Sequence, residues 1–110
     1  MTDIQDLIQR IRQFTEERDW DQFHNPKDLA IALSIEANEL LECYLWKKPN
    51  EAQTDKVKEE LADVLNYSFL LADKLGLDVK QIILEKLARN AEKYPVEKAK
   101  GNAKKYTDFQ

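Results

Sequence analysis

Residues 34–46 read SIEANELLECYLW, and this stretch decides how the chain can fold. At about 100° per residue, the rotation of an α-helix, Leu40 and Cys43 continue an apolar arc that begins earlier in the same predicted helix, and Glu36 falls inside that arc. Glu39 lies at the margin of the same face. A carboxylate on a buried apolar face is costly unless a positive charge compensates it. The stretch therefore predicts a helix that turns acidic groups towards the protein interior.

Four helices are predicted along the chain, without a convincing strand. An apolar stripe at helical spacing, capped by Thr2 and extending to Phe14, marks the first helix. Start and stop signals bound the other three, which run from Asn25-Pro26 to about Trp46, from near Thr54 to Gly76, and from the cap Asp78 to about Lys93. Residues 96–110 lack apolar periodicity and are expected to form an extended tail.

Short connections between the helices favour an all-α fold, an antiparallel four-helix bundle. The 110 residues are the size of one ordinary domain, so a single domain over residues 1–110 is expected. Helices this apolar in so small a chain also predict packing against another copy of the chain.

Composition excludes several function classes. The net charge of −4 argues against general affinity for nucleic acid. No apolar run approaches the roughly 20 residues that cross a membrane. The N-terminal MTDIQDLIQR lacks the layout of a secretory signal, and one cysteine, Cys43, fits a reducing compartment. A cytoplasmic protein is expected.

The third predicted helix repeats the acidic arrangement of the second. Glu60 falls inside its apolar arc, and Asp63 lies three residues later at the edge. Residues three apart share one helix face, so each pair of acids can converge on one point. The alternative interpretation is a set of buried ion pairs with lysine or arginine. The apolar arcs themselves offer neither residue, and four facing carboxylates cannot all stay ionised without a cation.

A metal site is therefore the favoured interpretation of the four acids. Oxygen ligands suit a hard cation, Mg²⁺, with Mn²⁺ able to substitute. A di-iron bundle would need a histidine in two of the motifs, and the chain has a single histidine outside both pairs. Mg²⁺ usually takes its remaining ligands from water and phosphate, which predicts a phosphorylated substrate.

The fourth predicted helix adds polar groups that suit such a substrate. Asn90 falls on its core face, and Lys86 and Lys93 flank it. Lysine can meet phosphate oxygens, and asparagine can read a sugar hydroxyl or a base. The alternative is that the lysines simply extend into solvent.

At this point several motifs resemble a known family. EANE at 36–39 followed by EELAD at 59–63 is similar to the ExxE…ExxD signature of the MazG-like nucleotide pyrophosphohydrolases. The segments ERDWDQFHNP, EELADVLNY, KLARNAEKYP and KGNAKKYTDF resemble the dCTP pyrophosphatase branch, in the same order along the chain. The resemblance covers the chain from about Phe14 to its end.

The resemblance implies hydrolysis of a nucleoside triphosphate between the α and β phosphates, with monophosphate and pyrophosphate as products. It implies that Glu36, Glu39, Glu60 and Asp63 bind Mg²⁺, and that the protein assembles as a dimer of dimers with sites built from more than one chain. The residues that it places around the nucleotide are Trp20, His24, Trp46, Tyr67, Asn90 and, less securely matched, Lys86.

Two rival functions remain open at this stage. One is a related pyrophosphohydrolase that prefers dUTP or another non-standard nucleotide, because the acids are common to all these enzymes. The other is a non-enzymatic helical adaptor that binds a partner helix, which leaves the two acid pairs unexplained. Within the enzymatic interpretation, Glu39 and Asp63 are equal candidates for the base that takes a proton from water.

Overall fold

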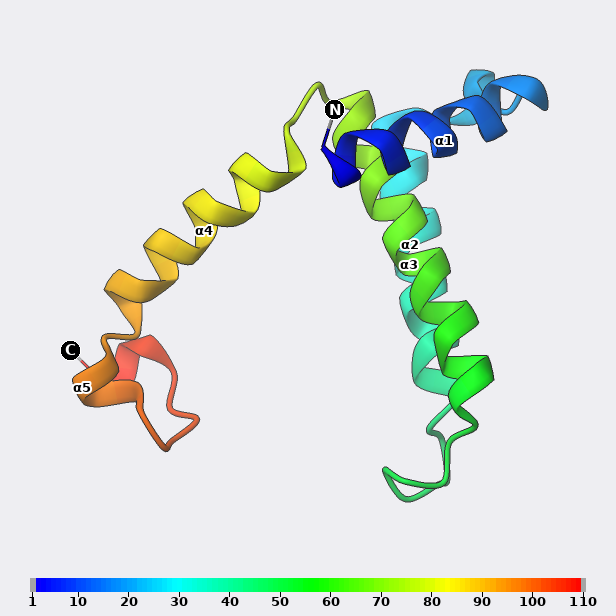
Figure 1. Ribbon diagram of the computed structural model, residues 1–110. Helices are drawn as coiled ribbons and strands as arrows, with labels where there is room; N and C mark the ends of the chain where they lie inside the picture. The colour runs from blue at the N-terminus through cyan, green and yellow to red at the C-terminus, as the bar shows by residue number, and fades with distance from the viewer. Residues whose placement is uncertain (1, 110) are drawn as a thin grey trace. The chain divides into compact units, whose positions relative to one another are not determined.

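The computed structural model describes residues 2–109, and every regular element within this range is helical (Figure 1). The predicted all-α class is therefore confirmed. None of the helices in the described range is long and apolar enough to cross a membrane. The chain divides into two compact units, Met1–Leu77 and Asp78–Gln110, which are described separately below.

Helix α1 (Asp3–Glu17) begins where the sequence predicts. The Gln5 amide donates to the Thr2 hydroxyl at 3.1 Å, and the Thr2 amide donates to the Gln5 side chain at 3.0 Å. This reciprocal capping box satisfies two amide donors that a helix start leaves unpaired. Further along α1, the Arg12 guanidinium donates two hydrogen bonds, of 3.0 and 2.5 Å, to the Asp73 carboxylate. That bidentate pair ties α1 to α3.

Helix α2 (Pro26–Glu42) starts as predicted and ends earlier than predicted. The Asn25 side chain caps it by accepting from the Asp28 amide at 2.9 Å. The expected end near Trp46 is wrong, because the helix stops at Glu42. Three successive amides, those of residues 43–45, donate to carbonyls three residues back rather than four, which tightens the chain into turns. Trp46 then takes a positive φ of 62°, which no helix allows.

Helix α3 (Thr54–Lys74) ends at the predicted glycine. Gly76 has a φ of 67°, a left-handed conformation that glycine adopts without steric cost. The Leu77 amide donates to the Ala72 carbonyl and the Gly76 amide to the Asp73 carbonyl, at 2.9 and 3.1 Å. These two bonds form a Schellman motif, which closes the helix.

Helices α2 and α3 lie side by side and form the centre of the first unit (Figure 1). The buried apolar residues of this unit are Leu29, Cys43, Leu70 and Ala72. Leu29 is 1% exposed. Many other large apolar side chains are about half exposed, such as Ile35 at 53% and Leu65 at 48%. The α2–α3 pair is thus the scaffold on which any site in this unit depends.

The second unit contains α4 (Val79–Lys93), which Asp78 caps by accepting from the Gln81 amide at 2.9 Å. The bounds of α4 agree with the sequence prediction. The segment after it was expected to be extended, but it forms the short helix α5 (Val96–Ala99) and the 3₁₀ turn η2 (Tyr106–Phe109). Pro95 explains α5, because its fixed φ suits a helix start and its carbonyl accepts from the amides of residues 98 and 99.

Truncation of Leu29 should show how far the stability of the first unit depends on the apolar side chain that α2 buries. We expect Leu29→Ala to lower the free energy of unfolding by about 2–5 kcal/mol, because the side chain is fully enclosed and leaves a cavity. Leu29→Met keeps the volume and should cost less than about 1.5 kcal/mol. Urea unfolding followed by circular dichroism measures both, and equal losses would contradict the packing described.

Candidate active site

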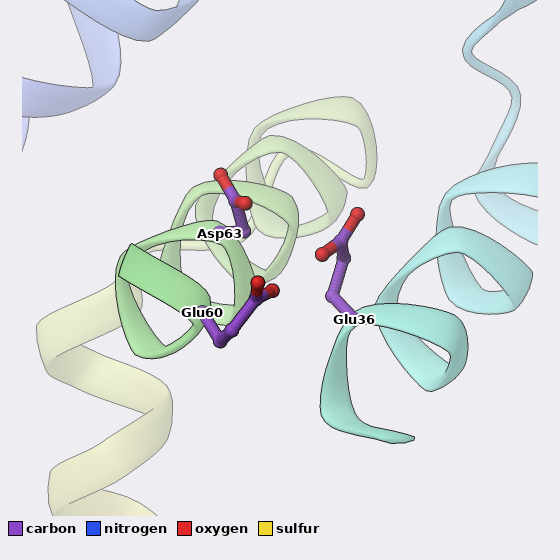
Figure 2. Close-up of side chains that lie close together, drawn as sticks. All are labelled: Glu36, Glu60 and Asp63. Atoms are coloured by element: carbon purple, nitrogen blue, oxygen red, sulfur yellow. The ribbon is translucent and has the colours of Figure 1, made fainter. Parts of the chain in front are cut away.

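Carboxylates from α2 and α3 meet between the two helices. Glu36 projects from α2, and Glu60 and Asp63 project from α3 towards it (Figure 2). One carboxylate oxygen from each of the three lies within 4.8 Å of the other two. The structure therefore brings together three of the four acids that the sequence singles out, and we call these three the acidic cluster.

Two oxygens of the acidic cluster are buried without a partner. Glu60 is 7% exposed and Glu36 is half-buried, whereas Asp63 is exposed. The Oε2 atoms of Glu36 and Glu60 are enclosed and have no hydrogen-bond partner among the described residues. A buried polar atom in this state costs about 1–3 kcal/mol, more if it is charged. A cation between the helices would remove that cost.

Burial and the neighbouring carboxylates change the protonation of Glu36. Burial, the neighbouring Glu39 carboxylate, and then Asp63 and Glu60 raise the pKa of Glu36 to about 7. Glu39 is half-buried and lies outside the acidic cluster, although its charge acts on the cluster. Like charges this close cannot all ionise without a compensating cation, so the cluster retains a proton when no metal is bound.

One lysine reaches the acidic cluster from outside the apolar arcs. The Lys56 ammonium lies 2.9 Å from Oε1 of Glu60, one helical turn away on α3. This ion pair lowers the pKa of Glu60 below its ordinary value. Lys56 lies outside the apolar arcs, but it stands four residues before Glu60, a spacing at which side chains of one helix meet, and its long side chain reaches over the turn from the surface. Ion pairing is thus present at one of the four acids, and Glu36 has no such partner among the described residues.

The donor set fits a divalent metal ion. All donors of the acidic cluster are carboxylate oxygens, which hard cations prefer. Glu36 and Glu60 each offer a buried oxygen without a partner, and Asp63 is accessible from solvent.

A cavity of about 690 Å³ opens between α1, the aromatic loop that follows it, and α3. Four of the residues singled out from the sequence line it, namely Trp20, His24, Asp63 and Tyr67. Its wall is mainly apolar, which is typical of a small-molecule site. His24 adds a buried Nδ1 atom without a hydrogen-bond partner among the described residues.

Local interactions hold the aromatic loop at the mouth of this cavity. The Trp20 amide donates to the Thr15 carbonyl at 3.0 Å, and Asp21 in the 3₁₀ turn η1 (Asp21–Phe23) pairs with Lys74 at the end of α3. The Trp20 ring packs edge-to-face on Phe14, with centroids 5.7 Å apart. Arg18 covers the Phe14 ring at 3.7 Å. The backbone of Trp20 is therefore tied to the end of α1, and its ring rests on Phe14, which Arg18 covers in turn.

The cavity and the acidic cluster adjoin. Asp63 belongs to both. Tyr67 lines the cavity, and its pKa is raised by burial and then by the charges of Glu36, Asp63 and Glu39. A molecule in the cavity can thus present its polar end to the carboxylates while its flat end contacts the aromatic residues.

Phe14 and Asn66 are among the cavity residues that the sequence did not indicate as binding residues. Phe14 was assigned only to the apolar stripe of the first helix, although that stripe faces the cavity. Asn66 lies between Asp63 and Tyr67 on α3 and also lines the cavity. Its place beside two predicted site residues was the available signal.

Three predicted binding residues are not brought to this site by the structure of the first unit. Trp46 is 99% exposed and does not line the cavity. Lys86 and Asn90 lie on α4 in the second unit, where Lys86 is exposed and Asn90 is half-buried. Their contact with a nucleotide remains a prediction.

Comparison with known proteins gives consistent matches. Residues 31–109 match the MazG-like family. The chain is 37% identical over 91 residues to dCTP pyrophosphatase 1 of Mus musculus, and 35% identical over 91 residues to dCTP pyrophosphatase 1 of Homo sapiens. Each match covers 76% of this chain and 54% of the relative, so the chain spans about half the length of these curated relatives. The crystal structure of a pyrophosphatase from Archaeoglobus fulgidus DSM 4304 superposes with a TM-score of 0.80 at 33% identity, covering 86% of this chain and 94% of that one.

The raised pKa of Glu36 predicts a specific pH dependence of stability. In metal-free protein, folded Glu36 keeps its proton up to about pH 7, while the unfolded chain loses it near the ordinary value of 4.5. The folded state therefore binds more protons than the unfolded state between pH 4.5 and about 7. The stability that the Glu36 proton contributes is fully present below pH 4.5 and is lost as the pH rises to about 7.

Denaturant midpoints in EDTA between pH 4.5 and 7.5 measure this effect, with Glu36→Gln as the reference. Glu39, Glu60, Asp63 and Lys56 face the same group and remain in both proteins, so the difference between the two curves isolates Glu36. We expect wild-type stability to fall relative to the variant as the pH rises. If the stabilities of wild type and variant change with pH in parallel, the raised pKa of Glu36 is contradicted.

Proposed function

The chain belongs to the MazG-like family, and from this premise we propose that it is a nucleoside triphosphate pyrophosphohydrolase. The reaction is attack of water on the α-phosphate, which breaks its bond to the bridging oxygen and releases pyrophosphate. The observation that carries the proposal is the position of Asp63, shared by the acidic cluster and the apolar cavity. A triphosphate with a flat base needs these two environments side by side.

Mg²⁺ is the proposed cofactor, with Mn²⁺ as a substitute. Glu36, Glu60 and Asp63 would hold it, with Glu39 as the fourth acid beside them. When bound, the ion offsets the charge of the triphosphate and lowers the pKa of a bound water. Without it, a polyanion would have to approach carboxylates that already repel one another.

The cavity residues would bind and orient the nucleoside. Trp20 and Tyr67 offer aromatic surfaces, with Phe14 supporting Trp20, and stacking on such surfaces is worth about 1–3 kcal/mol per base in proteins that bind single strands. The free Nδ1 of His24 and the side-chain amide of Asn66 are polar groups that can read the edge of a base.

Proton transfer falls to a carboxylate beside the reacting water. Glu39 is our choice between the two candidates, because it lies close enough to act on Glu36 and stays outside the acidic cluster. It would accept the proton of the attacking water, while Glu36, Glu60 and Asp63 serve as ligands. The role of Lys86 and Asn90 would be to contact phosphate and sugar.

The proposed substrate is dCTP or a 5-modified dCTP, which would make the protein a house-cleaning enzyme of the nucleotide pool. Support comes from the two mammalian relatives, whose names state dCTP pyrophosphatase activity. The alternative within the class is a preference for dUTP or another non-standard nucleotide. An asparagine in the cavity leaves this open, because an amide can flip to pair with either cytosine or uracil.

A non-enzymatic helical adaptor is the alternative from another class. It accounts for the exposed apolar side chains but not for a pair of helices that encloses carboxylate oxygens without a partner among the described residues. Burial of such groups is destabilising and is a feature of functional sites rather than of packing surfaces.

The assembly proposed is a four-helix bundle protomer that forms a dimer of dimers in the cytoplasm, with residues 1–110 as one domain. The many half-exposed leucine and isoleucine side chains support burial against another copy, because monomers rarely expose large apolar patches. The free cysteine Cys43 suits a reducing compartment.

Pyrophosphate release across canonical and 5-modified nucleotides with Mg²⁺ tests the activity. We expect dCTP and its 5-substituted forms to give the highest kcat/KM. Glu36→Gln and Asp63→Asn should each reduce turnover at least about 100-fold while leaving the helical circular dichroism intact, since each removes a metal ligand. Undiminished turnover by both variants would remove the proposed function.

Substitution of Trp20 tests the base site. Trp20→Ala should raise KM for the nucleotide more than it lowers kcat, because the ring binds the base and takes no part in the chemistry. Phe23→Ala is the control, since Phe23 lies three residues further in the same loop, is 63% exposed and does not line the cavity. If both variants shift KM equally, Trp20 acts only through the loop.

A further inference from the structure

Lys56 stands in an unusual relation to the acidic cluster. Its side chain is 58% exposed, whereas the Glu60 side chain that it pairs with is 9% exposed. An exposed lysine thus reaches inward to a buried carboxylate, at 2.9 Å from Oε1. The pair bridges solvent and the interior between α2 and α3.

The two oxygens of Glu60 are therefore in different states. The Lys56 ammonium engages Oε1, while Oε2 is enclosed without a hydrogen-bond partner among the described residues. Glu60 also groups with Glu36 and Asp63. The lysine fixes one side of the carboxylate and leaves the other side available to a ligand.

This lysine already supplies a positive charge to the site before any metal arrives. A divalent ion held by Glu60 must bind against that charge. A unit charge a few ångströms from a divalent ion changes affinity by about tenfold even at the dielectric constant of water. A nucleoside triphosphate brings several negative charges, which attract both the metal ion and Lys56 and so offset the repulsion between them.

We propose that Lys56 is an internal counter-cation and positioning residue that holds Glu60 in the metal-free protein and weakens binding of free divalent metal. The metal is then retained chiefly when it arrives with the triphosphate. This inference rests on the proposed function and adds an order of binding to it: metal and nucleotide enter together.

The test measures the Kd of Mn²⁺ for nucleotide-free protein, by the loss of the free-ion signal in electron paramagnetic resonance. We expect Lys56→Gln to bind Mn²⁺ about tenfold more tightly than wild type. Lys56→Arg keeps the charge and should stay within about twofold. Lys58→Gln is the matched control, because Lys58 is exposed on the same helix two residues away and so faces elsewhere.

Two further measurements show whether Lys56 opposes metal binding at Glu60 or alters the protein as a whole. In a Glu60→Gln background, the tightening caused by Lys56→Gln should fall to less than about twofold, because the Glu60 carboxylate is the group that holds the exposed lysine near the metal ligands. In EDTA, Lys56→Gln should lower the melting temperature, since it leaves Glu60 buried without its counter-charge.

Weaker Mn²⁺ binding by Lys56→Gln, or equal effects at positions 56 and 58, would overturn the inference and leave the proposed function standing. Failure of the proposed function looks different. Wild-type protein would then bind no Mn²⁺ even with a non-hydrolysable dCTP analogue and would release no pyrophosphate.

Discussion

Repulsion among carboxylates that two packed helices force together is the constraint on which this structure depends. In the first unit α2 packs on α3, Leu29 of α2 is buried, and one oxygen each of Glu36 and Glu60 is enclosed. Apolar contact supplies the free energy that holds the acids close, and burial together with the neighbouring carboxylates raises the pKa of Glu36 to about 7. The carboxylates of the acidic cluster therefore repel one another, and only a cation or a proton reduces that repulsion.

The aromatic cavity lies next to the acidic cluster and can hold a ligand there. Asp63 joins the two environments, so a ligand that brings a metal to the carboxylates also places a flat group near Trp20 and Tyr67. The capping and pairing contacts at the ends of α1 and α3 hold the loop that carries Trp20. Local structure and site chemistry are therefore coupled through the same few residues.

The helix starts were predictable because capping is local. Thr2, Asn25 and Asp78 each accept from an amide three residues away, a contact that the sequence itself specifies. The end of α3 was equally predictable, because Gly76 is the residue type that favours the left-handed conformation after a helix. The end of α2 was not, because helical periodicity continues beyond Glu42 while the backbone turns. The short helix after Pro95 was missed because it has no apolar stripe.

The sequence by itself determined the all-helical class, the ends of most helices, and which acids share a face with apolar residues. Those properties follow from the period of the helix and from contacts between neighbours along the chain. Only the tertiary structure decided that Asp63 serves both the cluster and the cavity, that Phe14 and Asn66 line the cavity, and that Glu36 and Glu60 each enclose an oxygen between the helices. The physical reason is that these relations depend on how helices pack and on which rotamer a long side chain adopts, and neither is encoded in spacing along one helix.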